Sequence, residues 1–256
     1  MRSLNPHWTL DGFHARLVAL AQVKDGDKVL DLGCGRGNSL AHLLAKVGRT
    51  GEVVAADRNG GSLAAIRAKY SKEIADRRLK TVEMDLTGTL PFTLTSFNVV
   101  VCQNVIECIA DREGLLRELY RIIKPGGSAL IGHHDFDGVQ IASDDRDLTR
   151  RLVHGYADHT QAWQDASDGQ MGRLLAGLVA RSPFNASETE TLLFVDLTLS
   201  NDSYARVHLD GIVAVSEQFG IPTKDVKGWL RGLAARSDAG AFYYALPWTY
   251  VLARKI

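Results

Sequence analysis

A glycine-rich turn near the start of the chain carries the residues best suited to chemistry. This turn is the segment 29–37, with the sequence VLDLGCGRG. Glycine permits positive φ angles and leaves no Cβ in the way of a ligand that approaches the backbone. Open α/β sheets bind their ligands in the crevice beyond the carboxyl ends of the strands. Asp31, Gly33, Gly35 and Gly37 are therefore the first candidate binding residues.

Two more aspartates follow at the ends of the next two expected strands. Asp57 lies twenty residues after Gly37, where a carboxylate can accept hydrogen bonds from both hydroxyls of a ribose. Asp85 follows the next strand, where a carboxylate can accept a hydrogen bond from the exocyclic amine of adenine. Each aspartate alone could cap a helix or face solvent. Three carboxylates at the ends of successive strands favour one shared ligand site.

Alternating strands and helices position these residues. The expected strands span 28–32, 52–56, 79–84, 97–102 and 128–133, and the expected helices span 10–20, 39–47, 63–74 and 115–123. The strand at 97–102 is apolar throughout, which is typical of a parallel sheet covered on both faces. Alternation of this kind predicts right-handed crossovers and a doubly wound α/β sheet.

The pattern changes after residue 137, but no linker marks a boundary. Helices are expected within 148–180, 204–219 and 226–235, and strands at 191–199 and 242–253. We interpret the chain as a single domain in four parts. These parts are an N-terminal helical cap (1–22), a cofactor-binding core (23–137), a helical insertion (138–187), and the last strands with lid helices (188–256).

Composition excludes several classes of protein. The 256 residues hold 30 basic and 30 acidic side chains, whereas a protein that grips nucleic acid normally needs a basic face. The three cysteines form no C-x-x-C pair, so neither a disulfide framework nor a zinc site is expected. No apolar run is long enough for a membrane span, and no signal-peptide core is found. We expect a cytoplasmic protein without a metal.

The ordered motifs resemble those of class I, Rossmann-like, S-adenosylmethionine-dependent methyltransferases. The likeness is greatest to the ubiquinone and menaquinone methyltransferase branch, and it is specific over residues 23–137. It is carried by 31–37, Asp57, Asp85, the strand and turn at 97–107 (FNVVVCQNVIE) and the KPGG segment at 124–127. The resemblance implies a mostly parallel, seven-stranded sheet whose last strand, 242–253, is antiparallel. It also implies S-adenosylmethionine as the cofactor.

The resemblance assigns roles to individual residues. Asp31 and the glycine turn would hold the methionine moiety, and Asp57 would bind the ribose. Asp85 and the backbone of Leu86 would bind the adenine, and the backbone of Gln103 would line the methionine end. Arg58 is a further residue of the expected cofactor site.

Three positions depart from the family pattern. Arg36 stands where Thr or Ser is commoner, and Cys108 stands where such sequences often carry His. The segment 103–106, QNVI, replaces the Asp/Asn-Pro-Pro-aromatic motif of enzymes that methylate amino groups of nucleic-acid bases. Base methylation is therefore disfavoured.

Two other functions compete with methyl transfer. A nicotinamide-dependent oxidoreductase would carry G-x-G-x-x-G, but counting from Gly33 places Asn38 where the third glycine belongs. A non-catalytic protein that binds S-adenosylmethionine on the same fold is the other alternative, since fold does not fix function.

The sequence contains fewer patterns that indicate how the methyl acceptor is bound. Methyl transfer needs mainly alignment of the reactants, and a general base only where the acceptor arrives protonated. His133 and His134 end the fifth strand and should face opposite ways, so we hypothesise that one of them orients or deprotonates the acceptor. Trp8, His14 and Tyr156 are further candidate acceptor residues. The aromatic and apolar later helices favour a small organic acceptor, methylated on oxygen, nitrogen or carbon in secondary metabolism. The sequence is compatible with a homodimer.

Overall fold

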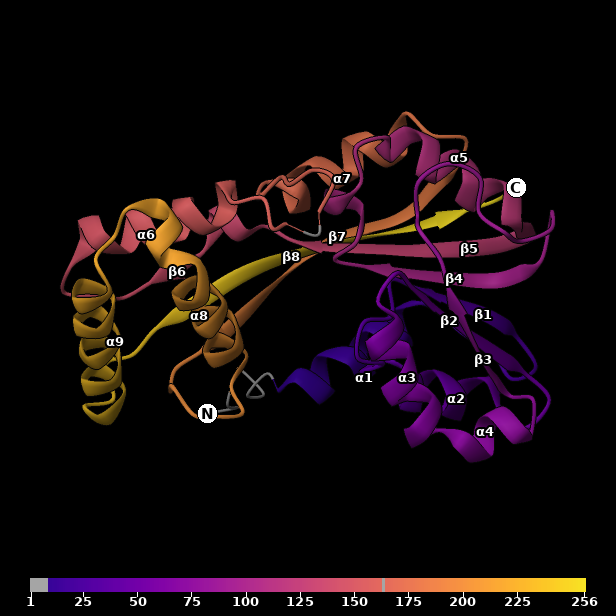
Figure 1. Cartoon of the computed structure of the whole chain (residues 1–256). Helices are drawn as coiled ribbons and strands as arrows, with labels where there is room; N and C mark the ends of the chain where they lie inside the picture. Colours follow the sequence, from indigo (N-terminus) through magenta and orange to yellow (C-terminus); the bar gives the residue numbers. More distant parts are fainter. Residues whose placement is uncertain (1–8, 163) are drawn as a thin grey trace, which may run out of the picture.

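One mixed sheet runs through the part of the chain that the computed structural model describes, residues 9–162 and 164–256 (Figure 1). Within these residues the sheet has eight strands. Seven of them follow the order β3-β2-β1-β4-β5-β8-β6, and the eighth, β7, pairs with β8 outside this path. The strands are β1 (Lys28–Leu32), β2 (Glu52–Asp57), β3 (Leu79–Glu83), β4 (Phe97–Gln103), β5 (Ile123–His134), β6 (Gln140–Ile141), β7 (Asn185–Asp196) and β8 (Tyr244–Arg254).

The first five strands form the parallel half of the sheet. β1 lies between β2 and β4, with Val29 opposite Val53 on one side and Val99 on the other. These strands are rich in buried β-branched residues because helices cover both of their faces. The predicted doubly wound sheet is confirmed.

Helices on the two faces create two separate cores. The helices α1 (Leu10–Leu20), α2 (Leu40–Val47) and α3 (Gly60–Lys69) cover one face, and α5 (Arg112–Ile122) and α7 (Met171–Ala180) cover the other (Figure 1). The helix expected over 63–74 is in fact two helices, α3 and α4 (Ser71–Ala75). Tyr70 separates them because its backbone, at φ −110° and ψ 32°, leaves the helical region.

The last strand is antiparallel, as predicted, and lies inside the sheet. β8 pairs with β5 on one side and with β7 along its whole length on the other. Its Tyr244, Trp248 and Tyr250 are among the largest fully buried side chains. The sheet has one strand more than the predicted seven, because the two-residue β6 also pairs with β8.

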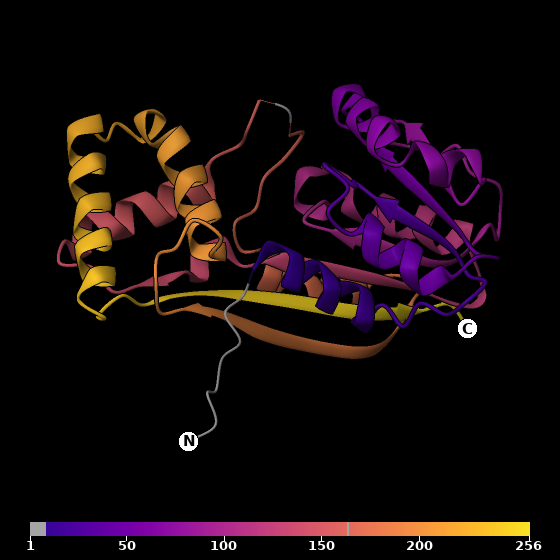
Figure 2. The ribbon, with the colours of Figure 1, turned by 90° about the horizontal axis from the view of Figure 1, so that it is seen from below.

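The remaining helices gather at one end of the molecule. Figure 2 shows α6 (Arg146–Asp158), α8 (Tyr204–Val215) and α9 (Thr223–Asp238) together, joined to the rest by the long strands β7 and β8. The indole nitrogen of Trp229 on α9 donates to the Thr149 hydroxyl on α6 at 2.8 Å. Of the helices in the expected insertion, α6 joins this group, whereas α7 packs on the sheet against β5 and β8. None of the helices in the described ranges is long and apolar enough to cross a membrane.

Strand β7 forms an open edge of the sheet. It begins six residues before the expected 191–199, and its residues 185–191 are exposed. No strand other than β8 pairs with it in the described part of the chain.

Candidate functional site

The glycine turn after β1 uses its three glycines differently. Gly33, Gly35 and Gly37 all have positive φ angles, of 70°, 50° and 75°. A Cβ on Gly33 would lie 2.3 Å from Val105, and one on Gly37 would lie 2.8 Å from Leu40. A Cβ on Gly35 would meet nothing within 4 Å. Gly33 and Gly37 are therefore required by packing, while Gly35 faces open space.

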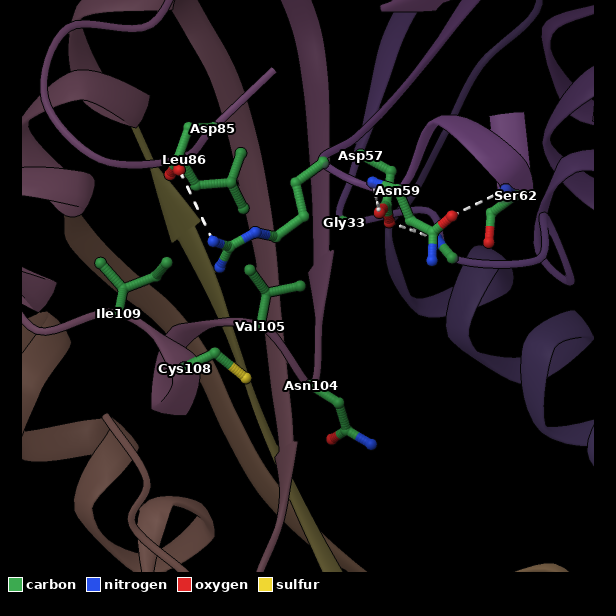
Figure 3. A pocket seen from close by; sticks show the side chains of 12 residues that line it. Gly33, Asp57, Asn59, Ser62, Asp85, Leu86, Asn104, Val105, Cys108 and Ile109 are labelled. Carbon is green, nitrogen blue, oxygen red and sulfur yellow. Dashed lines mark hydrogen bonds and ion pairs between the residues drawn. The ribbon is translucent and has the colours of Figure 1, made fainter. Parts of the chain in front are cut away.

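That open space is a cavity of about 590 Å³ at the carboxyl ends of the parallel strands. In Figure 3, Asp57, Asn59 and Ser62 lie on one side of this cavity, and Asp85 and Leu86 lie on the other. Its lining residues come from the turns after four successive strands: Gly33, Gly35, Asp57, Arg58, Asn59, Ser62, Asp85, Leu86, Asn104, Val105, Cys108 and Ile109. We call it the large cavity.

The structure brings most of the predicted cofactor residues to the large cavity. Three of them, Asp31, Gly37 and Gln103, are not among its lining residues. Those that line it are Gly33, Gly35, Asp57, Arg58, Asp85 and Leu86. The lining residues that were not predicted are Asn59, Ser62 and those of the turn after β4, Asn104, Val105, Cys108 and Ile109.

The two aspartates that line the large cavity hold the turns around it. Asp57 accepts hydrogen bonds from the backbone N–H groups of Gly35 at 2.7 Å and Asn59 at 2.9 Å. Asp85 accepts a hydrogen bond from the backbone N–H of Thr87 at 3.0 Å. This hydrogen bond is the main reason why the pKa of the Asp85 carboxyl is lowered. Arg58 lies 3.7 Å from Asp85. A carboxyl group thus stands on each side of the cavity.

Asp31 lies behind the glycine turn as a buried carboxyl. Its Oδ2 atom is buried without a hydrogen-bond partner. Burial, with the nearby charge of Asp57, raises the pKa of Asp31 to about 7. A buried polar atom of this kind normally has a partner, so a cationic or hydrogen-donating group of a ligand would satisfy it.

The turn after β4 is held by the last strand. Gln103 accepts a hydrogen bond from the indole nitrogen of Trp248 at 2.9 Å and donates to the Asn104 side-chain oxygen at 2.9 Å. Asn104 has a φ of 53°, a conformation in which Asn is enriched among non-glycine residues. The side chain of Gln103 thus serves packing, and its neighbour Asn104 reaches the cavity.

The two candidate histidines face opposite ways, as predicted. Both are fully buried, and neither lines the large cavity. His134 lies among aromatic rings, with its Nε2 3.0 Å from the Tyr204 hydroxyl. Burial, and then the neighbouring His133, lowers the pKa of His134 well below its usual value. His133 lies on the other side with its Nε2 3.6 Å from Glu107 Oε2, and burial lowers its pKa to about 4.

The other candidate acceptor residues have separate positions. His14 is 2.8 Å from the Ser39 hydroxyl and does not line the large cavity, and burial lowers its pKa to about 4. Trp8 lies outside the described residues. Tyr156 lines a second cavity of about 190 Å³, which we call the small cavity.

The small cavity adjoins the large one at Asn104, which lines both. Its lining residues are Asn104, Glu107, Phe136, Tyr156, Ala157, His159, Gln161, Gln164 and Ser167. Asn104, Glu107 and Gln164 were not predicted as site residues. Asn104 and Glu107 lie in the segment 97–107, which carries the family resemblance only as a whole, and Gln164 carried no signal of its own.

The three cysteines form no disulfide and no reactive site on the surface of the described part of the chain. Cys34, Cys102 and Cys108 are free and buried. Burial raises the pKa of Cys108 to about 11, so its side chain is a neutral thiol. Within residues 9–162 and 164–256, no three His, Cys, Asp or Glu side chains are grouped to hold a metal ion.

Known proteins share this fold and part of this sequence. Residues 30–131 match the family model of a methyltransferase domain. A ubiquinone/menaquinone biosynthesis C-methyltransferase, UbiE, of Stenotrophomonas maltophilia (strain K279a) is 39% identical over 114 residues, which are 44% of this chain and 45% of that relative. The chain thus matches less than half the length of this relative.

Two solved structures illustrate the range of activities on the same fold. One is a geranyl diphosphate C-methyltransferase from Streptomyces coelicolor A3(2) in complex with Mg²⁺, geranyl diphosphate and S-adenosyl-L-homocysteine (TM-score 0.57, 14% identity, 95% of this chain and 80% of that one). The other is the [4+2]-cyclase SpnF (TM-score 0.58, 15% identity, 96% and 81%).

The strand order and the cavity at the carboxyl ends of the strands define a class I methyltransferase fold. Residues 30–131 match a methyltransferase domain and resemble the ubiquinone/menaquinone C-methyltransferases in sequence. A geranyl diphosphate methyltransferase with the same fold was solved in complex with S-adenosylmethionine.

Gly37→Ala should destabilise the protein more than Gly35→Ala. Both changes place an alanine at a positive φ, which costs about 1–2 kcal/mol. Only the Cβ at position 37 also meets Leu40 and Ile66 at 2.8–3.1 Å, and overpacking of this kind costs about 1–3 kcal/mol more. Urea unfolding of the two variants measures the difference, and equal losses would contradict the different roles given to the two glycines.

Proposed function

We propose that this protein transfers a methyl group from S-adenosylmethionine to a small organic acceptor. One observation carries the proposal: Gly35, Asp57 and Asp85, from the turns after three successive strands, line one cavity of about 590 Å³. This volume lies within the roughly 300–1,000 Å³ of small-molecule sites.

The residues of the large cavity fit the chemical groups of the cofactor. Asp57, beside Gly35, would accept hydrogen bonds from the ribose hydroxyls. Asp85 and the backbone of Leu86 would bind the adenine, and Arg58 would lie along the same wall. The unpartnered Oδ2 of Asp31 would receive the cationic amino group of the methionine moiety. The backbone of Gln103 would complete the methionine end.

The protein has little covalent chemistry to perform. S-adenosylmethionine, when bound, supplies a methyl group already activated on a sulfonium sulfur. The protein must hold the acceptor in line with that group and exclude water. Of the two candidate histidines, we give the role at the acceptor to His133, because its Nε2 faces Glu107 of the adjoining small cavity. His134 is instead enclosed by Phe13, Phe136 and Tyr204.

A second candidate is binding of S-adenosylmethionine without methyl transfer. The fold shared with a [4+2]-cyclase favours keeping this alternative. A nicotinamide-dependent oxidoreductase is the weaker alternative. An acceptor in secondary metabolism, a cytoplasmic location, the absence of nucleic-acid binding and a homodimer stay predictions.

Binding of the cofactor tests the proposal directly. Ligand at a hundred times its dissociation constant should stabilise the fold by about 2.7 kcal/mol. We expect S-adenosylmethionine and S-adenosylhomocysteine to raise the melting temperature, and NADH and NADPH to leave it unchanged. The opposite result would overturn the proposed function. Incubation with labelled S-adenosylmethionine and a cell extract then separates the two candidates, since the binding protein would yield no labelled product.

Asp57→Ala should weaken S-adenosylhomocysteine binding about ten- to a hundred-fold. The reason is the loss of charge-assisted hydrogen bonds, which are worth about 1.5–3 kcal/mol. Calorimetry measures this effect, with the exposed Asp76→Ala as the matched control. Unchanged affinity in Asp57→Ala would mean that Asp57 serves only to hold the glycine turn.

Cofactor affinity should depend on pH through Asp31. The pKa of Asp31 is raised to about 7 in the free protein, so its carboxyl is largely neutral below that pH and ionised above it. A cationic amino group binds the ionised form, and affinity should therefore fall by up to about tenfold per pH unit below about pH 7. Calorimetry across about pH 5–8 measures the slope. Asp31→Asn should flatten it, and a wild-type affinity independent of pH would rule out this contact.

A further inference from the structure

The small cavity has the size and the walls of a subsite for one ring. Its volume is about 190 Å³, and an apolar cavity of roughly 150 Å³ is enough to hold benzene. The rings of Phe136, Tyr156 and His159 line it, together with the polar side chains of Glu107 and Gln164. A single aromatic ring that carries a small polar substituent would fill this space.

Glu107 is the acidic group of this cavity. It belongs to the short 3-10 helix η1 (Ile106–Cys108) that follows β4, and only 9% of the residue is exposed. Its Oε1 accepts a hydrogen bond from the Gln164 side chain at 3.4 Å, and its Oε2 lies 3.6 Å from His133 Nε2. Both oxygens thus have neighbours that fix the direction of the carboxyl group.

His133 faces Glu107 with a free lone pair. Its Nδ1 lies 2.8 Å from the backbone oxygen of His134, which can only accept a hydrogen bond. Nδ1 therefore carries the proton of the neutral ring, and Nε2 is an acceptor. Nε2 is fully buried and has no hydrogen-bond partner. A proton on Oε2 of Glu107 would satisfy it after a small movement.

Several charged and titratable groups surround this pair. Burial, and then the charge of Asp168, raises the pKa of Glu107 to about 7, while Arg112 acts in the opposite direction. His133 stays neutral because burial lowers its pKa to about 4. The groups that face the pair from neighbouring elements are Arg112 on α5, Asp168 before α7, Asp135 and His134 at the end of β5, Tyr156 on α6 and Cys108 on η1.

We propose that the small cavity binds the acceptor as a single-ring phenol, that Glu107 takes the proton of its hydroxyl, and that His133 is the positioning residue behind Glu107. The proposal rests on the proposed function, because the large cavity must hold the cofactor beside Asn104. It adds the substrate class and the proton acceptor to that function.

The proton step is balanced within the site. The O–H bond of the phenol breaks, its electron pair stays on the phenol oxygen, and the proton passes to the Glu107 carboxylate. The resulting phenolate is a stronger nucleophile, and the carboxyl group can then donate to His133 Nε2. A base that titrates near the working pH is the most effective for such a transfer.

Probe binding tests the subsite without any turnover. The probe is 4-fluorophenol, observed by ¹⁹F NMR with protein saturated by S-adenosylhomocysteine. We expect it to bind about ten- to a hundred-fold more tightly than 4-fluoroanisole, which lacks the hydroxyl proton. Glu107→Leu should abolish this preference, and Ser167→Phe should abolish binding of both probes by filling the cavity. Glu113→Leu, an exposed position on α5, is the matched control and should behave as the wild type.

The outcomes separate the two proposals. Failure of S-adenosylhomocysteine to bind in calorimetry would overturn the proposed function. Normal S-adenosylhomocysteine binding without binding of 4-fluorophenol, or with equal affinity for both probes, would overturn the further inference alone. Retained 4-fluorophenol binding in Ser167→Phe would place the probe elsewhere and would also overturn it.

A proton titration tests the pair itself. In protein with ¹⁵N-labelled histidine rings, the Nε2 resonance of His133 should shift with a midpoint near pH 7, although the ring stays neutral. The shift should vanish in Glu107→Gln. His208 is an internal control, because burial lowers its pKa to about 3 and no carboxylate shares its proton. A His133 resonance that stays flat around pH 7 would overturn its positioning role.

Discussion

The insertion of β8 between β5 and β7 is the constraint on which the rest of the structure depends. This strand runs against the direction of its neighbour β5 and is hydrogen-bonded on both sides, so the end of the chain must return to a place between two strands that come before it in the sequence. It also ties the two ends of the molecule together. Near one end, Trp248 donates to Gln103 in the turn that reaches both cavities. Near the other, the Tyr244 hydroxyl is 2.8 Å from His208 on α8.

The sequence predicts the cofactor side well because that side is built locally. Its residues lie at the carboxyl ends of the parallel strands or in the turns that follow them, and parallel strands bring their carboxyl ends together without further information. The acceptor side depends on contacts that no local pattern encodes. His134 is buried by Tyr204, which lies seventy residues further along the chain. Glu107 becomes a buried acid only because the segment around Gln164 folds over it.

This contrast explains why related folds support different reactions. The family match ends at residue 131, whereas seven of the nine residues that line the small cavity lie between 136 and 167. The shared part of the fold brings a reactive cofactor to a fixed place. The part of the chain after the family match supplies most of the wall of the small cavity. A methyltransferase and a [4+2]-cyclase share the architecture, so the fold alone does not fix the reaction.

The open edge along β7 has a consequence for the behaviour of the protein in solution. Unpaired strand edges are templates for association with other chains. Here Glu188 and Glu190 stand on the exposed part of the strand, and the Tyr250 hydroxyl of β8 lies within hydrogen-bond distance of a carboxylate oxygen of each. A second copy that approached in register would meet the same negative charges, and the repulsion would keep the two edges apart. The charged side chains of this strand thus protect an open edge from pairing with the edge of another molecule.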